Sequence, residues 1–359
     1  MSRKVNFYPG PTALPLSVLE EAQREFVDYQ GLGLSLVETS HRSAEYDAVH
    51  TRAAELIREL LGVPKGYHVL FLGGGATLQF AMVPMNLLSG GRFCDFTLTG
   101  AWASKAYEDA QKLGRVEVLF DGSASKYTTL PSSLSAHADA AYCHITSNET
   151  IGGVQWQDFP ETGSVPLVAD MSSDFLSRRV PVERFGLIYA GAQKNMGPAG
   201  ATVVVIREDL LEQSADNLPA YLSYTTHSKS NSLYNTPPVF SVYMIKLVLE
   251  WLKGSGGLDA MERRNVEKAS LLYRAIDESG GFYRCPVDPR VRSHMNVVFR
   301  LPSDDLEKRF ITESEEAGML GLKGHRSVGG CRASIYNATE IGGVRTLADF
   351  MAAFARKNG

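Results

Sequence analysis

Lys194 stands in a segment of small residues that suits a reactive amine. It occurs in AGAQKNMGPAG (190–200), which follows the apolar run FGLIYA and precedes ATVVVI. Small neighbours let the backbone and a ligand approach the amine, and nothing bulky shields it. A lysine that forms an imine must lose water and a proton before it can act as a nucleophile. The segment therefore predicts a catalytic lysine rather than a solvated surface one.

Asp170 closes another apolar run, VPLVAD, about one strand and its connection before Lys194. A carboxylate at a strand end often only caps the next loop. Its functional use would be to keep the nitrogen of a heterocyclic ring protonated. An acid and a lysine on neighbouring strand ends could face one bound ring, so the pair is a stronger signal than either residue alone.

Further residues could complete such a site. In LGGGATLQF a strand turns through three glycines into a helix at Ala76 and Thr77, and free amides at a helix N-terminus bind phosphate. The segment matches neither nucleotide fingerprint, and a plain tight turn is its alternative. Trp102 could stack on a flat ring or fill the core. Thr150 could offer a hydroxyl or serve a turn, and Gln193 could donate to a phosphate oxygen or satisfy its own loop.

Arginines and histidines indicate an anionic substrate. They occur as two His-Arg pairs and a single arginine beside two glycines: His41 and Arg42 in TSHRSAE, His325 and Arg326 in LKGHRSVGG, and Arg332 in GGCRASIY. Arginine binds carboxylate or phosphate through two hydrogen bonds, and an adjacent imidazolium adds a donor. Solvated surface arginines are the alternative. The clustering favours a substrate with at least two anionic groups.

A mainly parallel sheet is expected to position these residues. Continuous apolar runs between helical patterns indicate strands that are covered on both faces. In such sheets ligands bind at the carboxyl ends of the strands, which is where the candidate residues fall. The predicted strands are 67–72, 94–99, 116–120, 140–146, 165–170, 185–190 and 201–206, and the predicted helices among them include 43–62, 76–88 and 102–114.

The glycine pair at 256 and 257 is the expected boundary between two domains. The large cofactor-binding domain would comprise residues 16–256. The small domain would comprise 257–359, where helices and strands alternate, together with the extended segment 1–15 packed against it. Its predicted elements are helices 258–279, 306–319 and 344–359 and strands 295–301 and 331–336.

The composition excludes several classes of protein. The 359 residues are 44% hydrophobic and 21% charged, with a net charge of −4 and no basic block, which argues against nucleic-acid binding. No apolar run is long enough to span a bilayer, and the N-terminus lacks the pattern of a signal peptide, so no membrane association is expected. The cysteines (Cys94, Cys143, Cys285 and Cys331) have no CxxC spacing, so we expect neither a metal site nor disulfides, and a cytoplasmic location.

Taken together, the motifs resemble those of the class V group of pyridoxal-phosphate-dependent aminotransferases. The segments that carry the resemblance are YAGAQKNMGPAG, ADMSS, SHRS, NETIGG, NTPP and KGHRSVGGCRASIYNA. It extends from NFYPGPT through the C-terminal helix. It implies an α/β protein with the type I fold of pyridoxal-phosphate-dependent transferases, which is aspartate-aminotransferase-like. That fold has a large domain with a mainly parallel seven-stranded sheet and a smaller α/β C-terminal domain.

The resemblance also implies roles for the candidate residues. One pyridoxal 5'-phosphate per subunit would form a Schiff base with Lys194, which would also move the substrate α-proton. Asp170 would hold the pyridine nitrogen protonated, Trp102 would stack on the ring, and Thr150 would bind its phenolic oxygen. The groups expected to hold the cofactor phosphate are Ala76, Thr77 and Gln193, with the partner's Asn235 and the partner's Thr236. The active protein would therefore be a homodimer with composite active sites.

For the substrate, the resemblance implies that Arg332 clamps the α-carboxylate. The four residues of the two His-Arg pairs would receive either a phosphate group or the side-chain carboxylate of glutamate. The implied reaction is reversible amino transfer between L-glutamate and 3-phosphohydroxypyruvate, giving O-phospho-L-serine and 2-oxoglutarate in serine biosynthesis. Some members of the family also accept 4-phosphohydroxy-L-threonine in pyridoxine biosynthesis. This chain departs from some members in having no arginine in its glycine-rich turn, so the effect on anion affinity stays open.

Three alternatives remain at this stage. A transaminase for small amino acids with glyoxylate would share the cofactor but have little use for two His-Arg pairs. A regulator that binds the cofactor without turnover would not require both the lysine and the aspartate. Cys331, beside Arg332, also permits a desulfurase with a mobile cysteine, although a small buried cysteine is the simpler interpretation.

Overall fold

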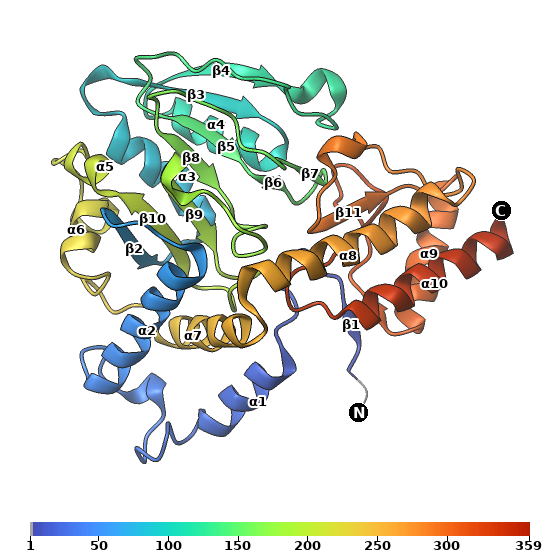
Figure 1. The fold of residues 1–359 in the computed structure, drawn as a ribbon, viewed down its shortest axis with the longest axis horizontal. Coiled ribbons are helices and arrows are strands. Elements are labelled where there is room, and N and C mark those ends of the chain that lie inside the picture. The colour runs from blue at the N-terminus through green and yellow to red at the C-terminus, as the bar shows by residue number, and fades with distance from the viewer. Residues whose placement is uncertain (1–2) are drawn as a thin grey trace.

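A seven-stranded sheet forms the centre of the large part of the molecule. The computed structural model describes residues 3–359. The strand order is β2-β10-β9-β8-β5-β3-β4, and only β10 runs antiparallel to its neighbours (Figure 1). The predicted mainly parallel seven-stranded sheet is confirmed. Its strands are β2 (Tyr67–Leu72), β3 (Phe93–Leu98), β4 (Arg115–Asp121), β5 (Cys143–Thr146), β8 (Leu167–Asp170), β9 (Phe185–Gly191) and β10 (Thr202–Arg207).

Both faces of this sheet are apolar, which is why its central strands are continuous hydrophobic runs. Along β9 every residue is buried. Ile188 and Ala190 belong to one core cluster, whereas Leu187 and Tyr189 belong to the cluster on the other face. Successive side chains point to opposite faces of a strand, so a strand that is covered on both sides must be apolar throughout.

Strand β5 is shorter than the predicted strand 140–146. The amide of Ala140 donates to the carbonyl of His137 at 2.9 Å, so a turn takes this residue out of the strand. Ala141 and Tyr142 still bond to β3 through their backbones but fall outside the regular pairing, which begins at Cys143. An apolar run predicts burial, and burial here extends beyond the strand.

Helices cover the two faces of the sheet. On one face α2 and α7 pack against each other and against the sheet, and on the other face α3 and α4 do so. The predicted helix 43–62 is confirmed as α2: the Ser43 hydroxyl accepts from the amide of Tyr46, and Gly62 ends the helix in the left-handed conformation. The helices of this part are α1 (Leu16–Glu25), α2 (Ala44–Leu61), α3 (Gly75–Leu87), α4 (Ala101–Gln111), α5 (Glu208–Glu212), α6 (Tyr224–Lys229) and α7 (Val239–Gly254).

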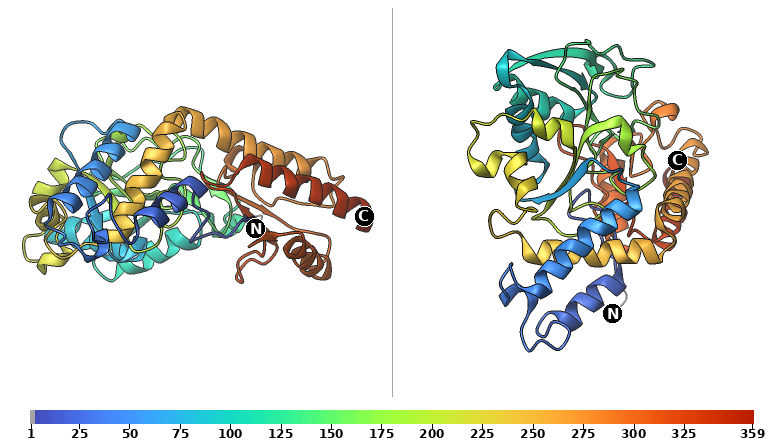
Figure 2. Two further views of the ribbon diagram at one scale, coloured as in Figure 1. Left: turned by 90° about the horizontal axis from the view of Figure 1, so that it is seen from below. Right: turned by 60° about the vertical axis from the view of Figure 1, so that its left-hand side comes forward.

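A smaller α/β unit follows α7 and projects to one side of the sheet (Figure 2). Between α7 and the next helix, Gly256 and Gly257 both have positive φ, 97° and 67°, and this turn lies where we place the domain boundary. The division into 16–256 and 1–15 with 257–359 stays a proposal. The elements of the unit are α8 (Gly257–Asp277), α9 (Asp304–Glu316), α10 (Ile341–Asn358), β11 (Asn296–Phe299), β12 (Met319–Leu320) and β13 (Cys331–Ser334).

The N-terminal segment packs against this small unit. Strand β1 (Val5–Asn6) pairs in parallel with β12. Phe7 is completely buried, in a core cluster that is otherwise formed by residues after 268. The two remaining strands, β6 (Asn148–Glu149) and β7 (Val154–Gln155), form a short hairpin between the sheet and the small unit.

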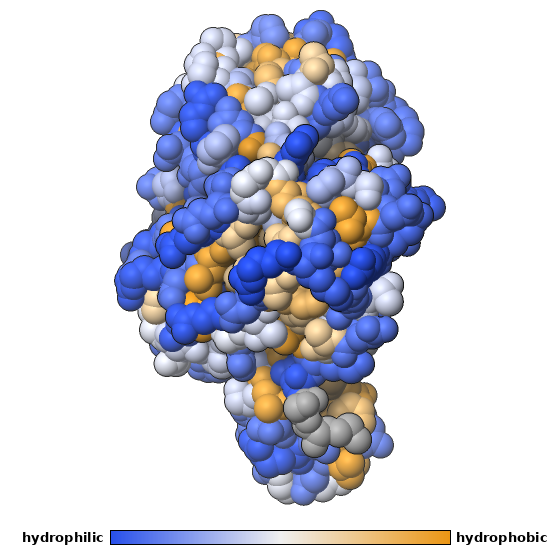
Figure 3. Space-filling view, turned by 90° about the vertical axis from the view of Figure 1, so that its right-hand side faces the viewer, coloured by the Kyte–Doolittle hydropathy of each residue, from blue (hydrophilic) through white to orange (hydrophobic). Residues whose placement is uncertain are grey.

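Within residues 3–359 no helix is long and apolar enough to cross a membrane. The same residues contain no group of three or more His, Cys, Asp or Glu that could hold a metal ion. The face of the molecule seen from the side of the small unit is mainly hydrophilic, with apolar residues scattered over it (Figure 3).

We predict that Phe7→Ala lowers the free energy of unfolding by about 3–5 kcal/mol, because it leaves a cavity in the core of the small unit. Urea unfolding measures the change. The matched control is Val266→Ala on α8, whose side chain is 39% exposed and which should change stability by no more than about 0.5 kcal/mol. Equal effects of the two substitutions would contradict the anchoring role of Phe7.

Candidate active site

The predicted lysine, aspartate and threonine meet at one edge of the large sheet. Strands β5, β8 and β9 are adjacent and parallel, so their carboxyl ends lie side by side. Asp170 is the last residue of β8, and Thr150 and Lys194 lie in the segments that follow β5 and β9. The Lys194 amine donates to the Thr150 hydroxyl at 2.6 Å.

The Lys194 amine has the properties of a nucleophile. Burial lowers its pKa to about 8, although the Asp170 and Glu149 carboxylates act in the opposite direction, and the Arg332 cation lowers the pKa further. Gly10 lies against the lysine side chain, because a Cβ on this glycine would be 3.7 Å from Lys194 Cγ. A larger fraction of the amine is therefore neutral near pH 7 than in a solvated lysine.

Asp170 is a buried carboxylate that faces the lysine. Its side chain is buried at the strand end, and Oδ1 accepts a hydrogen bond from the Ser172 amide at 2.8 Å. Burial raises the pKa of Asp170, whereas its bonds to Ser172 and the Lys194 cation lower it. A carboxylate in such dry surroundings interacts strongly with any proton or cation placed beside it.

Trp102 lies beside the lysine at the start of α4. The Lys194 amine is 5.8 Å from the centroid of the indole ring, and the indole nitrogen is buried without a hydrogen-bond partner among residues 3–359. Lys105, one helical turn later, places its amine 4.5 Å from the same ring. The carboxylate of Glu149 accepts hydrogen bonds from the amides of Trp102 and Ala103.

The glycine-rich turn opens α3 as predicted. Gly74 stands at the N-cap in the left-handed conformation, with φ 83°, and no side chain caps the helix. The first amides, which include those of Ala76 and Thr77, therefore have no side-chain acceptor. Gln193 is half-buried next to Lys194, and its carbonyl accepts from the Thr12 amide at 3.2 Å.

Arg332 belongs to the small unit, and its buried guanidinium lies at the same edge of the large sheet as Thr150. It lies on β13, 4% exposed, and one guanidinium nitrogen donates to the Thr150 carbonyl at 3.2 Å. Its Nε is buried without a partner within residues 3–359, and burial lowers its pKa. A buried guanidinium that has no carboxylate partner is costly, which points to an anionic ligand.

The His325–Arg326 pair lies in the loop before β13. The pKa of His325 is lowered by burial first and then by the charges of Arg332, Arg326 and Lys105, so these cations lie near one another. A cavity of 500 Å³ is lined by His325 and Arg332 together with residues of the small unit and of the segment after β4.

The other His-Arg pair lies elsewhere in the chain. His41 and Arg42 precede α2, which packs on α7 at the lower left of Figure 1, whereas the small unit lies at the right. Asn235 and Thr236 are exposed residues just before α7. The structure thus brings together Lys194, Asp170, Thr150, Trp102, His325 and Arg332, and it leaves His41 and Arg42 remote from the small unit.

The sequence reasoning missed Glu149 and Lys105. Glu149 stands directly before Thr150 in SNETIGG, and a carboxylate that follows an apolar run is a signal that could have been used. Lys105 follows Trp102 by three residues, the spacing that places two side chains on one side of a helix.

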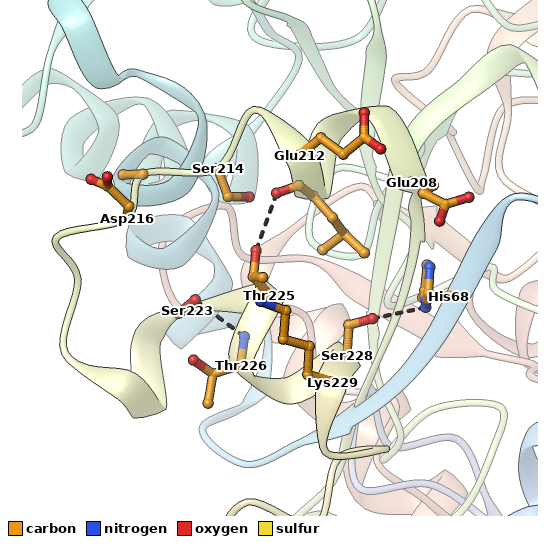
Figure 4. Close-up of a pocket in the computed structure, with 12 residues that line it drawn as sticks. His68, Glu208, Glu212, Ser214, Asp216, Ser223, Thr225, Thr226, Ser228 and Lys229 are labelled. Carbon is orange, nitrogen blue, oxygen red and sulfur yellow. Dashed lines mark hydrogen bonds between the residues drawn. The ribbon is translucent and has the colours of Figure 1, made fainter.

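Two other features lie outside this site. A cavity of 640 Å³ is lined by carboxylates and hydroxyls near the opposite edge of the sheet, where the Ser228 hydroxyl and the His68 ring lie 2.8 Å apart, and it contains none of the predicted residues (Figure 4). Cys331 is buried in the core of the small unit, and burial raises the pKa of its thiol. Both properties suit a packing residue and not the mobile nucleophile of a desulfurase.

Comparisons with known proteins agree with this geometry. Residues 4–347 match the family model for aminotransferase class-V. The phosphoserine aminotransferase of Geobacillus kaustophilus (strain HTA426) is 56% identical over 359 residues, which cover 99% of each chain. A solved phosphoserine aminotransferase from Bacillus circulans subsp. alkalophilus has 55% identity and a TM-score of 0.98 over 99% of each chain.

A PLP-bound phosphoserine aminotransferase from Trichomonas vaginalis is 37% identical, with a TM-score of 0.90 over 98% of this chain and 100% of that one. The family match spans most of the sequence, and the relatives cover it almost end to end. This chain belongs to the aminotransferase class-V family.

Proposed function

We propose that this chain catalyses reversible amino transfer between L-glutamate and 3-phosphohydroxypyruvate, giving O-phospho-L-serine and 2-oxoglutarate. The observation that carries the proposal is the placement of the Lys194 amine, 2.6 Å from Thr150 Oγ1, beside the unpaired Arg332. Relatives that are 51–56% identical over the full length are named phosphoserine aminotransferases, which supports the choice of substrate. A role in serine biosynthesis follows from this reaction.

The residues at the sheet edge fit pyridoxal 5'-phosphate. They offer an amine for its aldehyde, a carboxylate for its ring nitrogen, a hydroxyl for its phenolic oxygen, and an indole whose nitrogen is unpartnered. When bound, the group supplies an electron sink for negative charge at the substrate α-carbon. Asp170 would hold the ring nitrogen protonated, Thr150 would donate to the phenolic oxygen, and Trp102 would orient the ring.

The phosphate of the cofactor would lie at the start of α3. The uncapped amides of Ala76 and Thr77 point to an anion, and the helix dipole favours one there. Gln193 would add its side-chain amide. We include the partner's Asn235 and the partner's Thr236, because these residues are exposed on each chain.

Lys194 would have two tasks. It would attach the cofactor through Nζ, and after displacement by the substrate amine it would accept the α-proton and deliver it to the C4′ carbon. Both tasks require an amine that is neutral part of the time, which burial provides. Asp170 would keep the ring nitrogen protonated.

Arg332 would bind the substrate α-carboxylate through Nε, which has no partner within residues 3–359. The second anion would lie near His325 and Arg326, joined by the partner's His41 and the partner's Arg42. One set of cations would serve the phosphate of phosphoserine and the side-chain carboxylate of glutamate in turn. The same pocket leaves 4-phosphohydroxy-L-threonine as a substrate to be tested for a role in pyridoxine biosynthesis.

A homodimer is part of this proposal. Exposed apolar side chains gather on α1, the segment after it and the start of α7, on either side of the region that carries His41 and Arg42. They include Phe26, Val27, Leu34, Val37 and Phe240, and the rings of Phe26 and Phe240 are in edge contact. Such a surface is typical of a protein interface. A partner seated there would complete both sites.

We also propose a cytoplasmic location. All four cysteines are free, and three of them are buried. Free buried thiols are typical of proteins in a reducing compartment.

Lys194→Ala should abolish turnover of O-phosphoserine, with a loss of about 10³-fold or more, because it removes the amine that we assign to cofactor attachment and α-proton transfer. Some pyridoxal phosphate should still bind without a covalent link, as equilibrium dialysis would show. Lys112→Ala removes an exposed lysine on the far end of α4 and should leave turnover unchanged. Wild-type rates in Lys194→Ala would refute the assignment.

Covalent attachment of pyridoxal phosphate to the cofactor-free protein should quicken as the pH rises towards about 8, because the neutral Lys194 amine is the reacting form. Asp170→Asn removes a carboxylate that stabilises the ammonium form, so the midpoint should move to lower pH. Stopped-flow absorbance at several pH values measures both midpoints. An unchanged midpoint in Asp170→Asn would show that the two groups do not interact.

Arg326→Ala should raise the KM for O-phosphoserine roughly 10- to 100-fold and change the reaction with L-serine little, because a charged hydrogen bond contributes about 1.5–3 kcal/mol. Absorbance titration of the holoenzyme with each amino acid measures the difference. Arg290→Ala, at an exposed arginine outside the site, is the control.

Equal losses for both amino acids would make Arg326 structural. If the wild-type holoenzyme handled serine and phosphoserine equally well, a transaminase for small amino acids and glyoxylate would be favoured. If no amino donor changed the absorbance, the chain would be a cofactor-binding regulator.

A further inference from the structure

Glu149 is a buried carboxylate in the active site that the proposed function leaves without a task. Its side chain is completely buried. Oε1 accepts from the Ala103 amide at 2.9 Å, and Oε2 accepts from the Trp102 amide at 3.2 Å. These amides open α4, whose N-cap residue, Gly100, has no side chain to cap it. A Cβ on Gly100 would collide with the Glu149 carboxyl group, so the glycine makes room for this distant cap.

The position of Glu149 in the chain links two sides of the site. The next residue is Thr150, whose hydroxyl receives the Lys194 hydrogen bond and whose carbonyl receives that of Arg332. The side chain of Glu149 therefore ties the backbone of Trp102 to the backbone that carries Thr150.

A completely buried carboxylate that caps a helix costs free energy, because it loses its contact with water. The pKa of Glu149 is raised to about 7, first by burial and then by the Asp170 charge, against the lowering effects of the two amides and of Lys194. The hydroxyl of Tyr189 also lies near enough for the Glu149 charge to act on it. Helices are commonly capped by neutral serine, threonine or asparagine at smaller cost, so the ionisable group at this place calls for a reason.

We propose that Glu149 is a positioning residue. As a carboxylate it holds the first turn of α4, and with it the Trp102 ring, against Thr150 and Lys194. On protonation it releases one of the two amides. A protonated carboxyl keeps only one strong acceptor oxygen, and its hydroxyl cannot accept equally from a second amide. The role of Trp102 rests on the proposed function, whereas the link between Glu149 and the Trp102 amide does not.

The direct test observes the Trp102 amide in cofactor-free protein. The chain has three tryptophans, so ¹⁵N-tryptophan labelling gives three backbone amide signals, and loss of one signal in Trp102→Phe assigns it. The Trp102 amide should shift with a midpoint near pH 7, and the shift should vanish in Glu149→Gln. A pH-independent Trp102 signal, or one that still titrates with the same midpoint in Glu149→Gln, would overturn the proposal.

The stability of the same variant gives a second readout with a definite sign. The pKa of Glu149 is higher in the folded chain than its ordinary value of 4.5, so the folded state binds more protons than the unfolded state between about pH 4.5 and 7. The wild type therefore loses stability as the pH rises through this window, and Glu149→Gln does not. The Tm of Glu149→Gln relative to wild type should rise between pH 5 and 7 and stay constant above.

Ser303→Ala serves as the matched control, because it removes the cap of α9 in the small unit. Its Tm difference from wild type should not change between pH 5 and 7. A Tm difference for Glu149→Gln that stays constant or falls between pH 5 and 7 would mean that the pKa of Glu149 is not raised in the folded chain, and the release of an amide on protonation near pH 7 would be abandoned.

The holoenzyme completes the test. The kcat of the wild type should have a pH-dependent component with a midpoint near pH 7 that is absent from Glu149→Gln, whose kcat should be roughly tenfold lower with little change in KM. Gly100→Ala displaces the carboxyl group without changing its charge and should lower kcat similarly. If no variant or wild type turned over phosphoserine while the Trp102 amide titrated as expected, the proposed function would fail and the positioning role would stand.

Discussion

The burial of charge at the carboxyl edge of the sheet is the constraint on which the rest of the structure depends. Lys194, Asp170 and Glu149 lie there together, and moving such groups out of water costs several kcal/mol each unless partners replace the water. The partners are mostly backbone amides: that of Ser172 for Asp170, and those of Trp102 and Ala103 for Glu149. A parallel sheet brings strand ends and helix starts to one edge, so the fold that buries the charges also supplies the donors.

Hydrogen bonds that involve backbone groups also hold the small unit in position beside Lys194. The amide of Asn337 donates to the side chain of Asn195, the neighbour of Lys194, at 3.0 Å. The buried amine of Lys268 on α8 donates to the carbonyls of Ile335 and Tyr336, just before Asn337, at 2.9 and 2.6 Å. The end of β13 is thus fixed at two points, and Arg332 on this strand keeps its place at Thr150.

The sequence predicted the sheet well because each central strand is apolar on both faces, and it pointed to Asp170 and Lys194 because they lie at the end of such a strand and just after one. Ala140 shows the limit of that signal: it is as buried as a strand residue but belongs to a turn. Glu149 escaped notice because its partner, the start of α4, is distant in the chain, whereas the spacing of Trp102 and Lys105 was a local signal that went unused. His41 and Arg42 form a recognisable pair in the sequence, but no sequence signal shows that they precede α2 of the large sheet's covering layer while His325 belongs to the small unit.

The glycine-rich turn has no arginine, but the structure places other cations close together near the site. His325, Arg326, Arg332 and Lys105 are close enough for the three permanent charges to lower the pKa of the imidazole. Without an anion these groups repel one another, and His325 gives up its proton more readily than a solvated histidine does. A phosphate placed among them would offset that repulsion and raise the pKa of His325 again, because an opposite charge favours the protonated form. The imidazolium would then be an additional donor to the phosphate, so the missing arginine does not leave the pocket without cations.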